Sequence, residues 1–217
     1  ESDPWLPLLL SQEATQAFQD IGDRRDQVTA MNRLGQAQGD IGRWEEGEQT
    51  LREALDLARR VRIPFAVLQT ELHLAALLCS VDQESALSEA QTLAERILKT
   101  PGLSAGYTGW CHGILASVSL RRHLFERAIE QGRSALPLCS RVPLRLLWVQ
   151  SLLAAALLQT DAHAEAAQLV QKMLIAQEEL GGGYMEIVVR KTAAQTFRAQ
   201  GLAARSAMEE RTADARL

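Results

Sequence analysis

Apolar residues recur along this chain at the spacing of an α-helix. In the stretch 26–60, Leu34 lies near the middle of one apolar run, and Leu51 and Leu55 belong to a second run that follows a short turn containing glycine. Spacings of three and four residues place apolar side chains on one face of a helix, whereas a strand alternates apolar and polar residues. No stretch shows that alternation clearly. The pattern predicts two antiparallel helices joined by a turn, a helical hairpin.

The hairpin pattern is repeated along the chain. Each first helix has a large residue followed by a small one at its centre, and in three copies another small residue follows thirteen positions after the large one. These pairs are Leu34 and Gly47, Leu115 and Ala128, and Leu153 and Ala166. Weaker copies are centred on Leu74 and Ala193, which makes the centres 38 to 41 residues apart. A fixed period of this size indicates stacked helical repeats.

We therefore predict an all-α fold, a right-handed α-α superhelix of antiparallel helical hairpins, in a single domain over 1–217. Pro64 and Pro143 open two first helices, and the six prolines mostly fall between helices. The opening run, with Leu10, Phe18 and Ile21 on one face, fits only the second half of a hairpin. The chain also begins without Met, so we expect a fragment of a longer protein. The expected hairpins span 5–21 (second half only), 26–60, 64–99, 106–138, 143–180 and 184–211.

The first full hairpin carries a characteristic set of residues, namely Leu34-Gly35, Gly42-Arg43-Trp44 and Leu51-Arg52-Glu53-Ala54-Leu55. These residues resemble the tetratricopeptide repeat (TPR) family, in the long-period form found in MalT-like transcription activators, NTPase-containing regulators and some bacterial serine/threonine kinases. The resemblance implies a TPR-like solenoid whose first helices line a concave groove. HEAT-like repeats, which have a similar period, are the alternative fold.

The resemblance also implies a function. It favours a non-enzymatic interaction module of a bacterial signalling or transcription-regulating protein, which binds a protein or peptide partner, or a small effector, in the groove. The alternative is a self-association module of a multidomain kinase or NTPase regulator, in which exposed apolar surface forms a homo-oligomer.

Composition and charge narrow the classes of partner. The 217 residues are 47% hydrophobic with a formal charge of −4, which allows a sizeable core and disfavours direct nucleic-acid binding. A mean hydropathy of −0.11 and the lack of a long apolar span disfavour a membrane protein. Three cysteines in apolar surroundings, Cys79, Cys111 and Cys139, are typical of reduced thiols and favour the cytoplasm.

We find no catalytic, metal-binding or cofactor-binding motif. The four histidines, His73, His112, His123 and His163, show no spacing of metal ligands. Cys111 and His112 are adjacent, but neighbours on a helix point about 100° apart, so their spacing does not make a nucleophile and base. We expect neither metal nor cofactor and no enzymatic activity.

The groove face is predicted from the repeat. Positions two and five residues on either side of each central large residue lie on the side of the first helix away from the stack. Trp110 and Trp148 hold equivalent places in consecutive hairpins and fit aromatic anchors for a partner, although both also fit ordinary core positions. The groove residues we select are Asn32, Gln36, Leu72, Trp110, Ser117, Leu120, Trp148, Ser151, Leu158, Lys191, Gln195 and Arg198.

Overall fold

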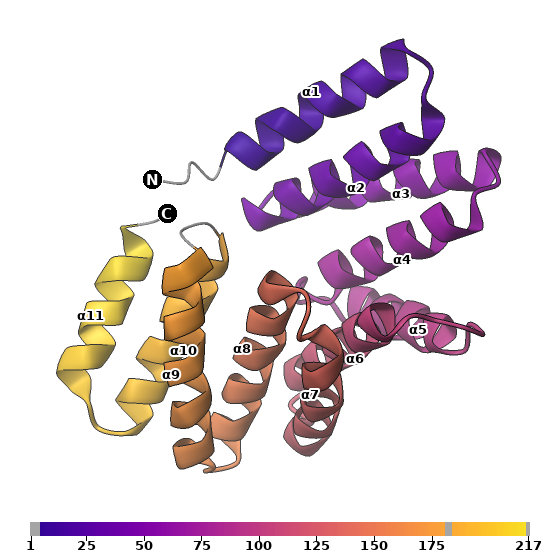
Figure 1. The fold of residues 1–217 in the computed structure, drawn as a ribbon. Coiled ribbons are helices and arrows are strands. Elements are labelled where there is room, and N and C mark those ends of the chain that lie inside the picture. Colours follow the sequence, from indigo (N-terminus) through magenta and orange to yellow (C-terminus); the bar gives the residue numbers. More distant parts are fainter. Residues whose placement is uncertain (1–4, 181–183, 216–217) are drawn as a thin grey trace. The chain divides into compact units, whose positions relative to one another are not determined.

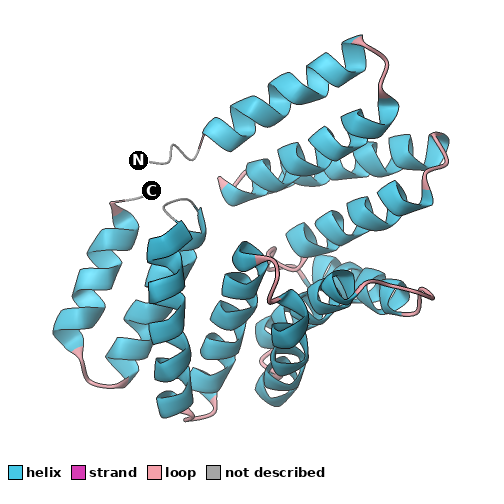
Figure 2. Ribbon diagram, in the orientation of Figure 1, coloured by secondary structure: helices cyan, strands magenta, loops and turns pink. Residues whose placement is uncertain are grey.

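The structure, a computed structural model, describes residues 5–180 and 184–215. These residues form eleven α-helices joined by short loops, and no strand occurs among them (Figure 2). The helices fall into two compact units (Figure 1). The N-terminal unit holds α1 to α5, and the C-terminal unit, which begins at Thr100, holds α6 to α11.

The N-terminal unit contains two complete hairpins preceded by one helix. Helix α1 (Leu6–Asp20) packs against α2 (Arg24–Asp40), which pairs with α3 (Trp44–Arg60). The next hairpin consists of α4 (Pro64–Leu78) and α5 (Glu84–Leu98). Pro64 is the first residue of α4, where its missing N–H is no loss because the first N–H groups of a helix have no acceptor within it.

The C-terminal unit contains three hairpins. The first pairs α6 (Ala105–Arg121) with α7 (Phe125–Cys139), and the second pairs α8 (Pro143–Gln159) with α9 (His163–Leu180). The third pairs α10 (Tyr184–Ala199) with α11 (Ala203–Asp214). One proline departs from the expected pattern: Pro137 lies inside α7, two residues before its end, rather than between helices.

The core is built from successive helices. In the N-terminal unit, Val28 of α2, Ala54 of α3 and Ala66 of α4 belong to one buried cluster. In the C-terminal unit, one cluster joins α7, α8 and α9, and another joins α8, α9 and α10, where Met173 packs near Phe197. The first helices α4, α8 and α10 therefore pack onto the hairpin that precedes each of them, as expected for repeats that cannot bury their apolar faces alone.

The turns between helices share one backbone geometry. In five of them, a residue with positive φ follows the helix, and the next N–H bonds to a carbonyl oxygen five residues back, as in Arg43 N to Gln38 O at 2.8 Å. This is the Schellman closure of a helix end, which favours glycine because a Cβ is strained at positive φ. The positive-φ residues of these turns are Gly42, Arg62, His123, Asp161 and Gly201.

Helix α1 packs through a face that matches the expected one only in part. Leu8 and Ser11 are buried and Phe18 is half-buried, whereas Leu10 and Ile21, which were also expected on the packed face, are 56% and 74% exposed. The helix thus keeps an apolar side uncovered in this unit. Among the described residues, no helix is both long enough and apolar enough to cross a lipid bilayer.

Candidate functional site

Three glycines line one side of α6 at helical spacing: Gly106, Gly109 and Gly113. A Cβ added to Gly109 would lie 2.7 Å from Cβ of Leu138 on α7, and one added to Gly113 would lie 2.5 Å from Cζ3 of Trp148 on α8. Non-bonded carbon atoms are best separated by about 3.5 to 4.0 Å. Glycine at these two positions therefore allows α6 to pack directly against both neighbouring helices.

The indole of Trp148 packs against α6 at Gly113, where the two helices approach closely. It lies against Gly113, and it packs beside the buried cluster of Ala135, Cys139 and Val149. Trp148 is nevertheless only half-buried. A rigidly supported aromatic ring that keeps part of its surface in solvent is well suited to contact a partner.

Trp110 is placed differently, beneath Arg145 of α8. The Arg145 guanidinium carbon lies 4.1 Å from the centroid of the Trp110 ring, and its Nη1 donates a hydrogen bond of 3.3 Å to the carbonyl oxygen of Gly106. Trp110 is only 7% exposed, while Arg145 is half-buried. Arg145 therefore covers the indole of Trp110, and the guanidinium is the more accessible of the two groups.

Arg145 and Trp148 are three residues apart on α8 and so lie on one side of that helix. They meet α6 in the same order along the chain, Arg145 at Gly106 and Trp148 at Gly113, so the two first helices run parallel. We call the surface formed by Gly106, Trp110, Gly113, Arg145 and Trp148 the α6–α8 seam.

Burial governs the ionisable groups around the seam. It lowers the pKa of Arg145, an effect that the neighbouring Cys139, Tyr107 and Cys111 oppose. It raises the pKa of Cys111 to about 12 and also raises the pKa of Cys139 and of Tyr107. Both thiols therefore stay protonated at neutral pH, which makes them poor nucleophiles and metal ligands.

The other predicted groove residues lie in both units, and they range from buried to exposed. Asn32, Leu72, Ser117 and Ser151 are buried, and Gln36, Leu120 and Leu158 are half-buried. Lys191, Gln195 and Arg198 are exposed on one side of α10, where Arg198 forms an ion pair with Glu210 of α11. Ser117 and Ser151 share α6 and α8 with the two tryptophans.

Two of these residues make or lack polar contacts that bear on their role. Gln36 donates a hydrogen bond of 3.0 Å from Nε2 to Oδ1 of Asp40, the last residue of α2. Asn32 is 1% exposed, and neither polar atom of its carboxamide bonds to another described residue. Gln36 is thus partly accessible to solvent, whereas Asn32 is buried.

Arg145 was not among the predicted groove residues. The sequence could have indicated Arg145, because a residue three places before Trp148 lies on the same side of a helix. The contact with Trp110 could not be found in that way, since it joins residues 35 positions apart through the packing of two hairpins.

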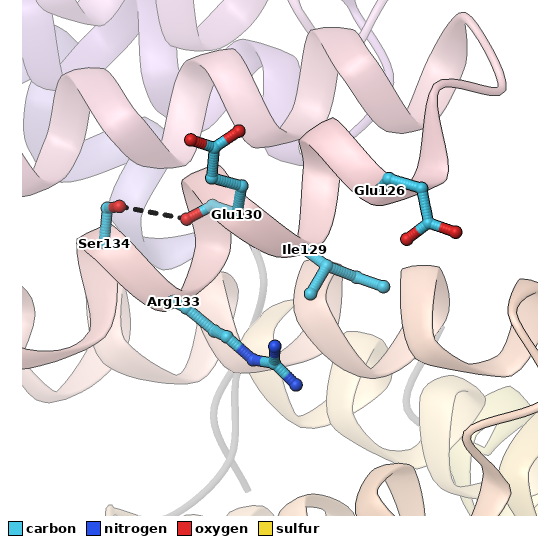
Figure 3. A pocket seen from close by; sticks show the side chains of 5 residues that line it. All are labelled: Glu126, Ile129, Glu130, Arg133 and Ser134. Carbon is cyan, nitrogen blue, oxygen red and sulfur yellow. Dashed lines mark hydrogen bonds between the residues drawn. The ribbon is translucent and has the colours of Figure 1, made fainter.

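A shallow hollow lies elsewhere in the C-terminal unit, lined by five residues of α7 (Figure 3). Its Arg133 is already paired with Glu165 of α9 through two contacts of 2.9 Å, and Ser134 donates a hydrogen bond to the carbonyl oxygen of Glu130. The hollow is lined by Glu126, Ile129, Glu130, Arg133 and Ser134. Among the described residues, no group of three or more His, Cys, Asp and Glu side chains is arranged to hold a metal ion.

Comparison with known proteins identifies the fold. No protein-family model and no curated protein sequence matches the chain. Solved structures do match it: BtubC (BKLC) from P. vanneervenii has a TM-score of 0.63 at 18% identity, over 99% of this chain and 91% of that one. This match and the repeated hairpins confirm the predicted all-α, TPR-like fold.

Two further solved structures are less similar. A tetratricopeptide repeat protein from Parabacteroides merdae ATCC 43184 has a TM-score of 0.49 at 14% identity, over 97% of this chain and 93% of that one. MamA (AMB-1) has a TM-score of 0.45 at 16% identity, over 87% of this chain and 90% of that one.

Proposed function

We propose that this chain is a non-enzymatic protein-interaction module that binds a segment of a partner protein on the side of its first helices. The observation that carries the proposal is the setting of Trp148, which packs against Gly113 and is only half-buried. Aromatic side chains held in this way contribute strongly to protein interfaces because little conformational entropy is lost on binding. In this proposal, Trp148 is the apolar contact of the partner.

The polar part of the contact is assigned to α10. Lys191, Gln195 and Arg198 are exposed on one side of that helix and belong to the same unit as Trp148. Charges at the edge of an interface chiefly guide association and orient the partner. Asn32, Gln36 and Leu72 lie in the N-terminal unit, and we propose no joint contact with them.

The resemblance to long-period TPR arrays extends the proposal to a biological setting. We propose that the module serves a bacterial cytoplasmic regulator of the signalling or transcription-activating kind. The three cysteines are free and buried, which agrees with a reducing compartment.

A peptide selection with a matched control tests the interaction. Random twelve-residue peptides are selected for binding to the full chain, and the dissociation constants of the selected peptides are measured for the unchanged chain, for Trp148→Ala and for Trp44→Ala. Trp44 is the control because it is also a half-buried tryptophan, lying 3.6 Å from an ideal Cβ at Gly39, but on a second helix of the other unit. We expect at least tenfold weaker binding to Trp148→Ala alone. Equal binding to both variants, or no selected peptide at all, would contradict the proposal.

A second function, self-association, is favoured by α1. Leu6, Leu9 and Leu10 are 50%, 52% and 56% exposed on that helix. Exposed apolar patches commonly mark surfaces that pair with another chain. Sedimentation at several concentrations tests this: a dimer that dissociates on Leu6→Glu with Leu10→Glu supports it, and a monomer throughout rejects it.

A further inference from the structure

Three buried glutamates among the described residues, Glu71, Glu186 and Glu209, have arginine partners. Glu71 of α4 lies 2.7 Å from Nη2 of Arg96 on α5 and 3.5 Å from Nη2 of Arg59 on α3. Arg190 of α10 joins Glu186 at 3.0 Å and Glu209 of α11 at 2.7 Å. Charge taken out of water is thus neutralised in these places, as the cost of burying a lone charge requires.

Arg145 has no such counter-ion. It is half-buried in the seam, yet among the described residues no carboxylate pairs with it, and the titratable groups that influence its pKa are two thiols and a tyrosine hydroxyl. Helices α6 and α8, which form the seam, contain no Asp or Glu. A half-buried cation without a counter-ion is a favourable site for an anion.

The geometry of Arg145 leaves it able to bind that anion. Its guanidinium carbon lies 4.1 Å from the centroid of the Trp110 ring, and its N–H groups lie in the guanidinium plane, around the edge. One of them, on Nη1, is used by the carbonyl oxygen of Gly106, and the others bond to no described residue. The fork of N–H groups matches the two oxygens of a carboxylate.

Charge along the chain points to an acidic partner. The stretch 100–160 contains six arginines and two glutamates, a net charge of +4 in a chain whose overall formal charge is −4. This stretch includes α6, α7 and α8, and hence the whole seam. An acidic segment would be attracted to this part of the protein in preference to the rest.

We propose that Arg145 binds a carboxylate of an acidic partner peptide, whose neighbouring apolar residue contacts Trp148. This inference rests on the proposed function, because it names the chemistry of the segment that the module binds. A carboxylate fits better than a phosphate, since a single guanidinium offers one positive charge and one fork. Trp110 is the platform that holds the guanidinium in place.

The test follows the four tryptophans of the chain by fluorine NMR of protein labelled with 5-fluorotryptophan. Trp110→Phe assigns the signal of Trp110. The probes are N-acetylglutamate, its neutral counterpart N-acetylglutamine, and inorganic phosphate, at constant ionic strength. We expect a saturable shift of the Trp110 signal with N-acetylglutamate, in the millimolar range, and at least tenfold weaker effects with the other two.

Variants show whether Arg145 is responsible. Arg145→Met is expected to abolish the shift, Arg145→Lys to weaken it at least tenfold because the fork is lost, and Arg141→Met to leave it unchanged. Arg141 is the control because it is an exposed arginine of the same stretch. Circular dichroism verifies that each variant is folded. If Arg145→Met does not fold, Arg145→Lys still tests the role of the guanidinium.

The outcomes separate the two proposals. An unchanged shift in Arg145→Met, an equal shift with N-acetylglutamine, or tighter binding of phosphate overturns the assignment of a carboxylate. Selected peptides that depend on Trp148 but bind Arg145→Met normally overturn this inference and leave the interaction module intact. If Arg145 binds N-acetylglutamate but no selected peptide depends on Trp148, the interaction module is overturned and the carboxylate site at Arg145 stands.

Discussion

Gly35 of α2 and Gly47 of α3 lie in contact where the two helices of the first hairpin cross. A Cβ added to Gly47 would be 2.7 Å from the carbonyl oxygen of Gly35, and one added to Gly35 would be 2.6 Å from Cγ of Leu51. Both contacts are shorter than a real Cβ tolerates, and one involves the backbone, which cannot rotate away. The crossing therefore depends on two glycines twelve residues apart, one on each helix of the hairpin.

Gly47→Ala should destabilise the protein by about 1 to 3 kcal/mol, because the methyl group forces the two helices apart. Gly132→Ala is the control: its Cβ would lie 3.3 Å from Cβ of Leu153, and the better helix propensity of alanine offsets that mild contact. Urea unfolding measures both. Equal stability of the two variants would show that the crossing is looser than described.

Arg62→Gly should stabilise the protein by about 0.5 to 1 kcal/mol, since Arg62 has φ of +55°, where a side chain is strained and glycine is not. Gly42→Ala is the reverse experiment at the corresponding position of the preceding turn, with φ of +83°. It should cost about 1 kcal/mol. Thermal unfolding of both variants checks the signs, and a loss of stability in Arg62→Gly would contradict the strain.

Asp40 makes stability depend on pH. Burial raises its pKa from 3.8 to about 6, although the hydrogen bond from Gln36 acts in the opposite direction. The folded protein therefore holds the proton more tightly than the unfolded chain, so this contribution is complete below pH 3.8 and is lost as the pH rises through 6. Asp40→Asn cannot titrate. The melting temperature of Asp40→Asn, relative to that of the unchanged protein, should rise between pH 4 and pH 7. A difference in melting temperature that does not change with pH would show that the pKa of Asp40 is not raised.

Arg190→Met should be strongly destabilising, by about 3 to 5 kcal/mol, because it removes the cation that pairs with both buried carboxylates, Glu186 and Glu209. Adding Glu186→Gln and Glu209→Gln to that variant should recover much of the loss. Arg133→Met removes an ion pair with Glu165 in which both side chains are exposed, and it should cost at most about 1 kcal/mol. Similar losses in the two single variants would argue against the buried cluster.

Trp110→Ala should cost about 3 to 5 kcal/mol, as truncation of a nearly enclosed aromatic side chain does. Trp5, which is 47% exposed, provides the comparison, and Trp5→Ala should cost less than about 1 kcal/mol. Denaturant unfolding followed by circular dichroism measures both. A small loss in Trp110→Ala would place the indole in solvent and remove the platform of Arg145.

The sequence by itself determined the helices and how they pair. Pro64 and Pro143 are the first residues of α4 and α8, and Gly42 and Gly201 close helices at positive φ, because these residues act through their own backbone. The small residues that follow the central large ones are buried, Ala116 and Ala154 among them. A repeated pattern can predict such features since each depends on neighbours within one hairpin.

Only the tertiary structure decided what covers each helix face. Trp110 and Trp148 are equivalent in the repeat, yet Trp110 is nearly enclosed and Trp148 is half-buried, because Arg145 of the following hairpin lies over the ring of Trp110. On α1, Leu8 rather than Leu10 is buried against the unit. Periodicity specifies which residues share a side of a helix, whereas exposure depends on the particular side chains that another helix brings to that side.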